Sequence, residues 1–317
     1  MTEQEQIKEA FEDLLKSLRK ETSKENRQKI KEAFEFANEA HKGVKRRSGE
    51  PYILHPLAVA KIAVKEIGLG TTSVISALLH DVVEDTDYTV EDIANLFGPK
   101  VASIVDGLTK ISGVMGSDTS RQAESFRKMI LTLADDVRVI LIKIADRLHN
   151  MRTLDALKPE KQIKIATQSL KIYAPLAGRL GLSFVKCELE DLAMRYLYPD
   201  DYYELVEFIK TKSKERQQFI EKICDELKAK LQELGIEGEV NGRQKHLYGI
   251  YKKMLKHAMQ DHMQITTHRH IVFPRIVDAF AERPSSRRLG PRRLSREQQE
   301  TKGRNRFKSV YHIRFAL

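Results

Sequence analysis

The sequence contains very little cysteine and no long apolar run. Only two cysteines, Cys187 and Cys224, occur among 317 residues, which is too few for a disulfide framework or a cage of thiolate metal ligands. No apolar stretch approaches the roughly 20 residues that a membrane-spanning helix needs. The N-terminal segment is charged and amphipathic, unlike a secretion signal. These absences predict a globular protein of the reducing cytoplasm, with no membrane contact.

Positive charge is concentrated at one end of the chain. The formal net charge is +10, and residues 257–317 contain 13 lysines and arginines against 5 acids, a net of +8, which leaves +2 for residues 1–256. Arginine outnumbers lysine 11 to 2 in this tail, whereas lysine predominates before it. Contact with nucleic acid or the ribosome is therefore predicted only through the tail, and not through the body.

Apolar residues recur at helical spacing through the first part of the chain. The predicted helices cover about 5–18, the segment around 30–37, 56–67, 72–85, 89–96, 99–110, 119–134, 136–150, 160–180, 184–196 and 201–233. Glycines and prolines predict a loop over 41–56, and no convincing alternating strand precedes residue 200. We expect an all-α helical bundle over 1–200.

The character of the sequence changes twice after this domain. From residue 235, "GIEGEVNGRQKHLYGIYKKML" predicts a short strand, a turn and a helix, so 201–256 is interpreted as a linking helix and the start of a small α/β segment. Residues 257–317 include "RPSSRRLGPRRLSREQQETKGRNR", whose low apolar content is typical of a disordered basic tail. Two origins stay open for it: a natural regulatory tail, or a foreign or frame-shifted one.

The stretch "ALLHDVVEDT" (77–86) puts one histidine and several acids directly after an apolar run. On a helix, His80 and Glu84 lie one turn apart, as do Asp81 and Asp85, so an imidazole and three carboxylates face nearly one place. Like charges repel there unless a cation lies among them, and a helix C-terminus also disfavours anions. A divalent metal site is the favoured interpretation, and a solvated acidic helix end is the alternative.

Two further segments offer metal ligands of the same kinds. In "VRVILIKIADRLHNMRTL" (137–154), Asp146 follows a long apolar run, and His55 precedes a proline at a predicted helix start. With His80 and Asp81 they make two imidazoles and two carboxylates, a set that suits Mn²⁺, Fe²⁺ or Zn²⁺ better than Ca²⁺. Spacing alone does not join residues from three segments into one site.

Four segments closely resemble, in order, the N-terminal half of RelA/SpoT-type alarmone enzymes: "HKGVKRRSGEPYILHP", "ALLHDVVEDT", "IKIADRLHNMRTL" and "YAPLAGRLGL". The resemblance covers roughly residues 1–256. Family members hydrolyse (p)ppGpp in an all-helical HD domain and synthesise it in a following nucleotidyltransferase-like domain. The resemblance therefore implies a metal-dependent guanosine-3′,5′-bis(diphosphate) 3′-pyrophosphohydrolase, which releases pyrophosphate and GDP or GTP.

The same resemblance implies three groups of site residues. The metal ligands, for which the implied ion is Mn²⁺, are His55, His80, Asp81 and Asp146. The acidic pair that acts on the attacking water is Glu84 and Asp85, with the base not assigned between them. The alarmone-binding residues are Arg46, Arg47, Ser48, Asn150 and Thr153. A solvated surface patch is the ordinary alternative for the basic run at 45–47.

The resemblance to the synthetase part is incomplete. "GRQKHLYGIYKKM" (242–254) retains Arg243, Lys245 and His246, but Gly249 stands where a serine is usual. Beyond Arg283 nothing matches, and the catalytic glutamate of the family has no counterpart. We therefore expect hydrolysis without synthesis.

Three other functions stay open. The first is a sensor that binds alarmone without turning it over, although the complete set of metal ligands and acids argues against it. The second is an HD phosphohydrolase of another nucleotide, such as a deoxynucleoside triphosphate. The third is binding of nucleic acid or the ribosome through residues 284–308.

Overall fold

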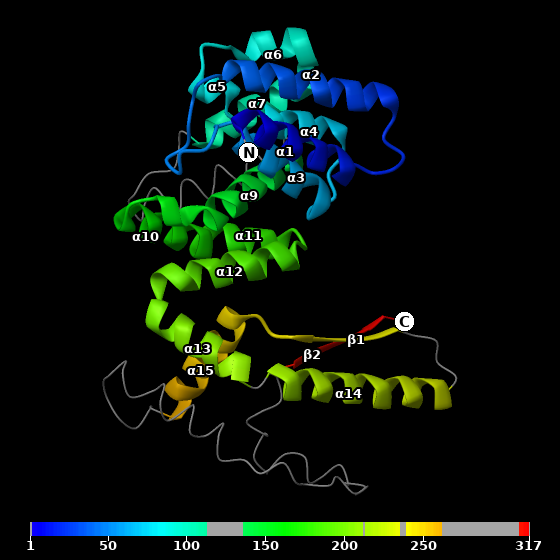
Figure 1. The fold of residues 1–317 in the computed structure, drawn as a ribbon. Coiled ribbons are helices and arrows are strands. Elements are labelled where there is room, and N and C mark those ends of the chain that lie inside the picture. Colours follow the sequence, from blue (N-terminus) through cyan, green and yellow to red (C-terminus); the bar gives the residue numbers. More distant parts are fainter. Residues whose placement is uncertain (1, 113–135, 212, 235–238, 262–310, 317) are drawn as a thin grey trace, which may run out of the picture. The chain divides into compact units, whose positions relative to one another are not determined.

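The computed structural model describes residues 2–112, 136–211, 213–234, 239–261 and 311–316. The chain divides into two compact units, residues 1–197 and 198–317. Each unit has its own set of elements (Figure 1). Among the described residues, no helix is both long enough and apolar enough to cross a bilayer.

The first unit is built from helices. They are α1 (Glu3–Ser17), α2 (Lys24–Ala40), α3 (Leu54–Lys65), α4 (Thr71–Leu78), α5 (Val82–Asp85), α6 (Val90–Phe97), α7 (Pro99–Ser112), α9 (Val137–Arg152), the short η1 (Leu154–Ala156), α10 (Pro159–Gln168), the π-helical η2 (Ser169–Tyr173), α11 (Ala174–Arg179) and α12 (Ser183–Leu197). The predicted all-α domain is confirmed. In the described part of this unit, β pairing is limited to one isolated bridge between Lys45 and Pro51.

Helices α3 and α9 pack against each other within the core of this unit (Figure 1). Helix α3 also contacts α1 and α4, and α9 contacts α7 and α12. Val59 and Ala60 on α3, and Ile140 and Ile144 on α9, are fully buried. Because such interiors are close-packed, this packing fixes where the first turn of α3 lies relative to the middle of α9.

The prediction of one continuous helix over 72–85 is wrong, because the chain turns within this segment. Helix α4 ends at Leu78 and α5 begins at Val82. The His80 ring closes the end of α4, since its Nδ1 lies 2.8 Å from the carbonyl oxygen of Ala77. A side chain therefore satisfies a carbonyl that has no partner in the helix itself.

The acidic residues after this turn also differ from the prediction. Asp81 is the N-cap of α5, and its carbonyl oxygen accepts the N–H groups of Glu84 at 3.2 Å and Asp85 at 2.8 Å. Glu84 and Asp85 thus lie in the first turn of a short helix. Because α5 is only four residues long and ends at Asp85, these carboxylates lie in a short turn and not at the C-terminus of the long helix that was predicted.

Other predicted helices occur with local changes. The predicted helix over 160–180 is the continuous path of α10, η2 and α11, in which Ser169–Tyr173 form a π-helical turn. The prediction over 201–233 corresponds to two helices, α13 (Pro199–Thr211) and α14 (Ser213–Glu233). The helix predicted over 119–134 lies outside the described residues.

The second unit contains the predicted strand and helix. Strand β1 (Glu239–Gln244) precedes α15 (Leu247–Asp261) and pairs antiparallel with β2 (Tyr311–Ala316). Val240 of β1 packs with Ile220 and Cys224 of α14. A Cβ added at Gly242 would collide with the Ile220 side chain, so β1 approaches α14 closely. The tail prediction falls largely on 262–310 and 317, which lie outside the described residues.

Asp136 provides a stability test at the start of α9. Its side chain accepts from the Arg138 N–H at 3.0 Å, as an N-cap does, and lies 3.0 Å from Lys100 Nζ. The hydrogen bonds from Arg138, followed by those from Lys100, hold the pKa of Asp136 well below its usual value. We expect Asp136→Ala to lower the free energy of unfolding by about 1 kcal/mol at neutral pH. Urea unfolding measures this effect.

The pH dependence of that stabilisation follows from the lowered pKa. A carboxylate whose pKa is lower in the folded state stabilises above its unfolded pKa of about 3.9, and the stabilisation is lost as the pH falls. The difference between wild type and Asp136→Ala should therefore shrink at about pH 3. Asp136→Asn is the matched control, because it retains the cap but not the charge. Equal urea midpoints for all three proteins at neutral pH would contradict this role.

Candidate metal centre and adjoining pocket

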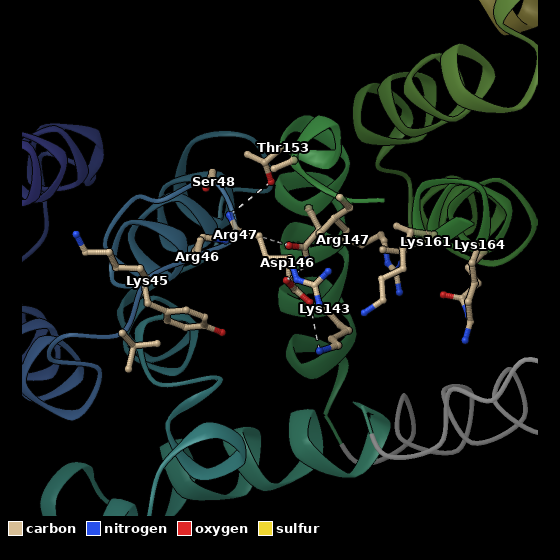
Figure 2. A pocket seen from close by; sticks show the side chains of 17 residues that line it. Lys45, Arg46, Arg47, Ser48, Lys143, Asp146, Arg147, Thr153, Lys161 and Lys164 are labelled. Carbon is tan, nitrogen blue, oxygen red and sulfur yellow. Dashed lines mark hydrogen bonds and ion pairs between the residues drawn. The ribbon is translucent and has the colours of Figure 1, made fainter. Parts of the chain in front are cut away.

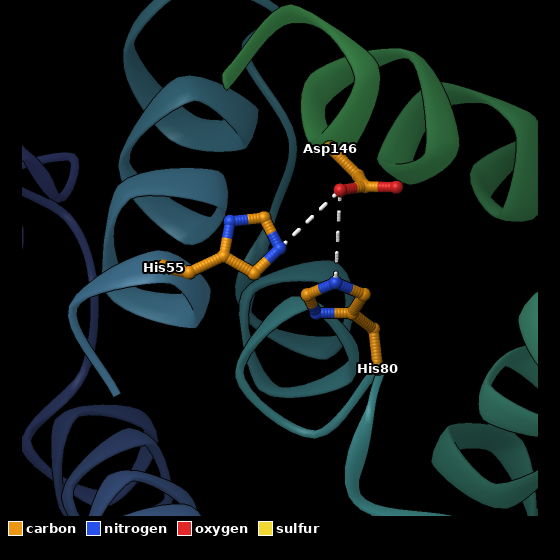
Figure 3. Close-up of side chains that lie close together, drawn as sticks. All are labelled: His55, His80 and Asp146. Atoms are coloured by element: carbon orange, nitrogen blue, oxygen red, sulfur yellow. Dashed lines mark ion pairs between the residues drawn. The ribbon is translucent and has the colours of Figure 1, made fainter. Parts of the chain in front are cut away.

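Three potential metal ligands from separate segments meet inside the first unit. His55 lies in the first turn of α3, His80 in the turn between α4 and α5, and Asp146 on α9. Their donor atoms all lie within 4.8 Å of one another, and the side chains point toward a common centre (Figure 3). Asp146 Oδ1 lies 3.3 Å from His55 Nε2 and 4.0 Å from His80 Nε2.

Asp81 lies against the same two imidazoles. Its Oδ2 is 3.0 Å from His80 Nε2 and 3.6 Å from His55 Nε2. The structure therefore brings together all four residues that the sequence singles out as ligands. Their side chains are between 1% and 13% exposed, so the centre is largely shielded from solvent.

The hydrogen bonding of His80 fits a metal ligand. Its Nδ1 donates to the Ala77 carbonyl, which leaves the Nε2 lone pair facing the centre. That Nε2 atom is buried and makes no well-aligned hydrogen bond within the described part of the chain, although Asp81 Oδ2 lies 3.0 Å away. Metal-bound histidines commonly donate their second N–H to a carbonyl in this way, so the inward-facing nitrogen and the mixed N/O donor set fit a divalent cation.

The charges around Asp146 keep this carboxylate ionised. Burial alone would raise the pKa of Asp146, but the Lys143 ammonium, 3.2 Å from Oδ2, and the nearby imidazoles lower it well below its usual value. Burial likewise opposes the charge on Lys143, yet the Asp146 carboxylate raises the pKa of that lysine. Lys143 neutralises one ligand while leaving Oδ1 directed at the imidazoles.

His149 is a site residue that the sequence analysis missed. Its Nδ1 lies 2.8 Å from His55 Nδ1 and 3.4 Å from Arg46 Nη1. Burial, together with the nearby His55 and Arg46, lowers the pKa of His149 to about 3, so its ring is neutral at pH 7. The only sequence signal was its position in the quoted "ADRLHNMRTL", one turn after Asp146.

A cavity of about 660 Å³ adjoins the metal centre and includes Asp146 in its lining. Its size is within the range of small-molecule sites. The loop before α3 contributes one side, while Lys161 and Lys164 of α10 lie across from it (Figure 2). Among the described residues that line it, Asp146 is the one acid, against seven basic residues: Lys45, Arg46, Arg47, Lys143, Arg147, Lys161 and Lys164. This charge balance suits a polyanionic ligand.

The five residues that the resemblance assigns to alarmone binding all line this cavity, namely Arg46, Arg47, Ser48, Asn150 and Thr153. Arg46 Nη2 donates to Asn150 Oδ1 at 3.0 Å, and its Nη1 lies 3.5 Å from Thr153 Oγ1. Arg47 and Ser48 are exposed on the loop. These positions are compatible with ligand contacts, and the roles themselves stay predictions.

The two predicted catalytic acids follow Asp81 on α5 and are not among the described residues that line the cavity. Glu84 is exposed on α5. Asp85 Oδ2 lies 2.9 Å from the hydroxyl of Tyr52, which also lies 2.7 Å from Asp81 Oδ2. Tyr52 is a second residue that the sequence analysis missed. Burial, with the charge of Asp81, raises its pKa, so the hydroxyl remains protonated and can donate to either carboxylate.

Metal binding at this centre should release a proton. Burial lowers the pKa of His55, so that ring is ready to bind a cation at neutral pH. Burial also opposes the charge on His80, but the Asp81 carboxylate outweighs it and raises the pKa of His80. We expect the affinity for a divalent cation to rise with pH as His80, whose pKa is raised, loses its proton. Calorimetry in buffers of different ionisation enthalpy counts the released protons, and a count of zero at a pH where His80 is protonated would contradict the expectation.

Comparisons with known proteins show what this chain is similar to. Residues 33–183 match the HD domain family. The GTP pyrophosphokinase of Myxococcus xanthus is 50% identical over 229 residues, 71% of this chain and 30% of that protein. The bifunctional (p)ppGpp synthase/hydrolase SpoT of Escherichia coli K12 is 47% identical over 235 residues, 74% of this chain and 33% of that protein. A solved structure of a metazoan SpoT ortholog that hydrolyses ppGpp shares 29% identity at a TM-score of 0.41, over 53% of this chain and 94% of that chain.

The helical fold and its buried histidine–aspartate centre place the first unit among the HD domains, which are metal-dependent phosphohydrolases. Over its N-terminal region the chain is similar to RelA/SpoT-type enzymes, at 50% and 47% identity to these two relatives. It spans about a third of the length of these curated relatives, 30% and 33%.

Proposed function

We propose that this chain hydrolyses (p)ppGpp at the 3′-pyrophosphate, with Mn²⁺ as the cofactor, and so degrades the alarmone of the stringent response. The observation that carries the proposal is the buried His/Asp centre at the edge of a cavity lined by seven basic residues. The relatives support the substrate class, since several are named guanosine-3′,5′-bis(diphosphate) 3′-pyrophosphohydrolase. Mn²⁺ accepts mixed imidazole and carboxylate ligands.

The chain provides the positions that this reaction requires. His55, His80, Asp81 and Asp146 would hold the ion, which supplies a Lewis acid for phosphoryl oxygens and lowers the pKa of water. The reaction breaks the bond between the ribose 3′ oxygen and phosphorus. Water adds its hydroxyl to the released pyrophosphate and its proton to the 3′ oxygen of GDP or GTP.

The remaining residues would orient the substrate and move the proton. Guanidinium groups bind phosphate oxygens in a two-pronged manner, a role suited to Arg47, which is exposed on the lining of the cavity. Ser48, Asn150 and Thr153 offer hydroxyl and amide groups to the nucleotide. Glu84 or Asp85 would take the proton of the attacking water, and the base is not assigned between them.

The test is release of pyrophosphate from ppGpp by the purified chain with Mn²⁺, against the same protein treated with a chelator. We expect metal-dependent release together with an equal amount of GDP. Binding of ppGpp without release at any Mn²⁺ concentration would favour the alarmone sensor instead. Faster hydrolysis of a deoxynucleoside triphosphate would identify a different HD phosphohydrolase.

We also propose that these residues hydrolyse but do not synthesise the alarmone. The proposal rests on the incomplete resemblance around residues 242–254, where Gly249 replaces the usual serine. Incubation with ATP and GDP should yield no ppGpp. Contact with nucleic acid, if tested by filter binding, should depend wholly on residues 284–308.

A further inference from the structure

The 43–52 loop, which precedes α3, turns tightly beside the metal centre. The Arg46 N–H donates to the Glu50 carbonyl at 2.9 Å, and the Gly49 N–H donates back to the Arg46 carbonyl at 2.9 Å. Gly49 has a φ of +89°, a conformation that glycine adopts without strain. The backbone of Arg46 is therefore fixed within the loop, and its side chain starts from a defined place.

One arm of the Arg46 guanidinium reaches His55 through His149. Arg46 Nη1 lies 3.4 Å from His149 Nδ1, and the same nitrogen lies 2.8 Å from His55 Nδ1. With its lone pair on Nδ1, His149 accepts from His55 Nδ1, and Arg46 Nη1 shares the same lone pair at a longer distance. His55 then donates from Nδ1 and keeps the Nε2 lone pair free for the centre, which is how partners of metal-bound imidazoles act.

The other arm reaches Asp146 through Asn150. Arg46 Nη2 donates to Asn150 Oδ1 at 3.0 Å, and Asn150 Nδ2 donates to Asp146 Oδ1 at 2.6 Å. Because Asp146 Oδ1 also lies 3.3 Å from His55 Nε2, the five side chains close a ring. One guanidinium thus holds two metal ligands that come from α3 and α9.

The far end of the same loop holds a third ligand. The Tyr52 hydroxyl donates to Asp81 Oδ2 at 2.7 Å. The Tyr52 ring stacks on the buried His41, with ring centroids 4.7 Å apart, which keeps the hydroxyl in place. Three of the four candidate ligands therefore contact this loop directly or through one intervening side chain.

We propose that Arg46 is a positioning residue, which couples the 43–52 loop to the metal centre, while the adjacent Arg47 serves the nucleotide. This inference rests on the proposed metal site but not on turnover. The Arg46 side chain is only 18% exposed and makes the contacts described above, whereas Arg47 is exposed on the same cavity. If a nucleotide that contacts this loop raises the affinity of the centre for the cation, the cation must raise the affinity for the nucleotide by the same factor.

The test compares Arg46→Lys with the matched control Arg47→Lys in the full chain, without nucleotide. Lysine retains the charge but is a point donor that cannot serve both His149 and Asn150. We expect Mn²⁺ affinity, measured by calorimetry, to fall about 10- to 100-fold in Arg46→Lys. Arg47→Lys should stay within about twofold of the wild type, because Arg47 is exposed and no hydrogen bond or ion pair joins it to a candidate ligand within the described residues.

A second measurement tests the coupling itself, with GDP as the probe. We expect Mn²⁺ to tighten GDP binding to the wild-type chain, and the effect to disappear in Arg46→Lys. In Arg47→Lys, GDP should bind more weakly, but Mn²⁺ should still tighten its binding. A Mn²⁺ effect of equal size in all three proteins would overturn the inference.

Tyr52→Phe tests the same loop with a smaller change, in case Arg46→Lys fails to fold. It removes only the hydroxyl that binds Asp81. It too should weaken Mn²⁺ binding, with an unchanged circular dichroism spectrum. If the wild type binds Mn²⁺ and all three variants bind it equally well, this inference alone fails. If the wild type binds no Mn²⁺, the proposed function fails as well.

Discussion

Asp146→Asn is expected to abolish Mn²⁺ binding and to reduce pyrophosphate release by about 10³-fold, since metal-ion stabilisation is worth several kcal/mol. Asparagine has the same shape and can still pair with Asn150, which lies 2.6 Å from Asp146 Oδ1. Asparagine lacks the negative charge of aspartate, and a divalent cation bound by two neutral imidazoles needs a carboxylate to balance its charge. Metal analysis after dialysis, together with the pyrophosphate assay, measures both effects.

The buried Lys143 requires a control in this experiment. Its ammonium lies 3.2 Å from Asp146 Oδ2, and both side chains are about one-tenth exposed, at 11% and 10%. Removing one partner of a buried pair costs about 3–5 kcal/mol, so Asp146→Asn alone will be less stable. The double variant Lys143→Met/Asp146→Asn removes both charges and should regain stability without regaining metal. Unchanged metal content in either variant would remove Asp146 from the site.

The sequence predicted the helical architecture because apolar spacing is a local signal. It did not predict the turn at His80, because four consecutive buried residues, 77–80, fit either a buried helix or its end. The deciding contact is the bond from His80 Nδ1 to the Ala77 carbonyl, which depends on a side-chain rotamer. Even so, His80 and Asp81 remained neighbours, so the metal interpretation of this stretch did not depend on the helix being continuous.

The candidate site required information that spacing does not contain. His55 and Asp146 are 91 positions apart, and only the packing of α3 against α9 brings them together. The family resemblance supplied that connection before the structure did. Lys143 could have been noticed, because a lysine inside the apolar run "VILIKIA" must have a buried partner. Tyr52 and His149 carried no comparable signal, since their roles depend on contacts across the fold.

Glu84→Gln is expected to slow hydrolysis about 10²- to 10⁴-fold while leaving Mn²⁺ binding unchanged. Glutamine retains the size and polarity of glutamate but cannot accept the proton of the attacking water. Glu84 is exposed on α5, where its replacement disturbs no buried contact. A lower kcat at constant metal content would therefore assign the proton-transfer step to this carboxylate, whereas wild-type rates would remove it from that role.

Asp85→Asn is the matched comparison, because Asp85 differs from Glu84 in one structural respect. Its Oδ2 lies 2.9 Å from the Tyr52 hydroxyl, which also binds Asp81. Since Asp85→Asn changes the acceptor for that hydroxyl, it should alter metal affinity as well as rate. If Glu84 is the base, Glu84→Gln lowers kcat alone, whereas Asp85→Asn acts mainly by weakening Mn²⁺ binding. Saturating Mn²⁺ should then restore the rate of Asp85→Asn but not the rate of Glu84→Gln. The opposite pattern would assign the base to Asp85.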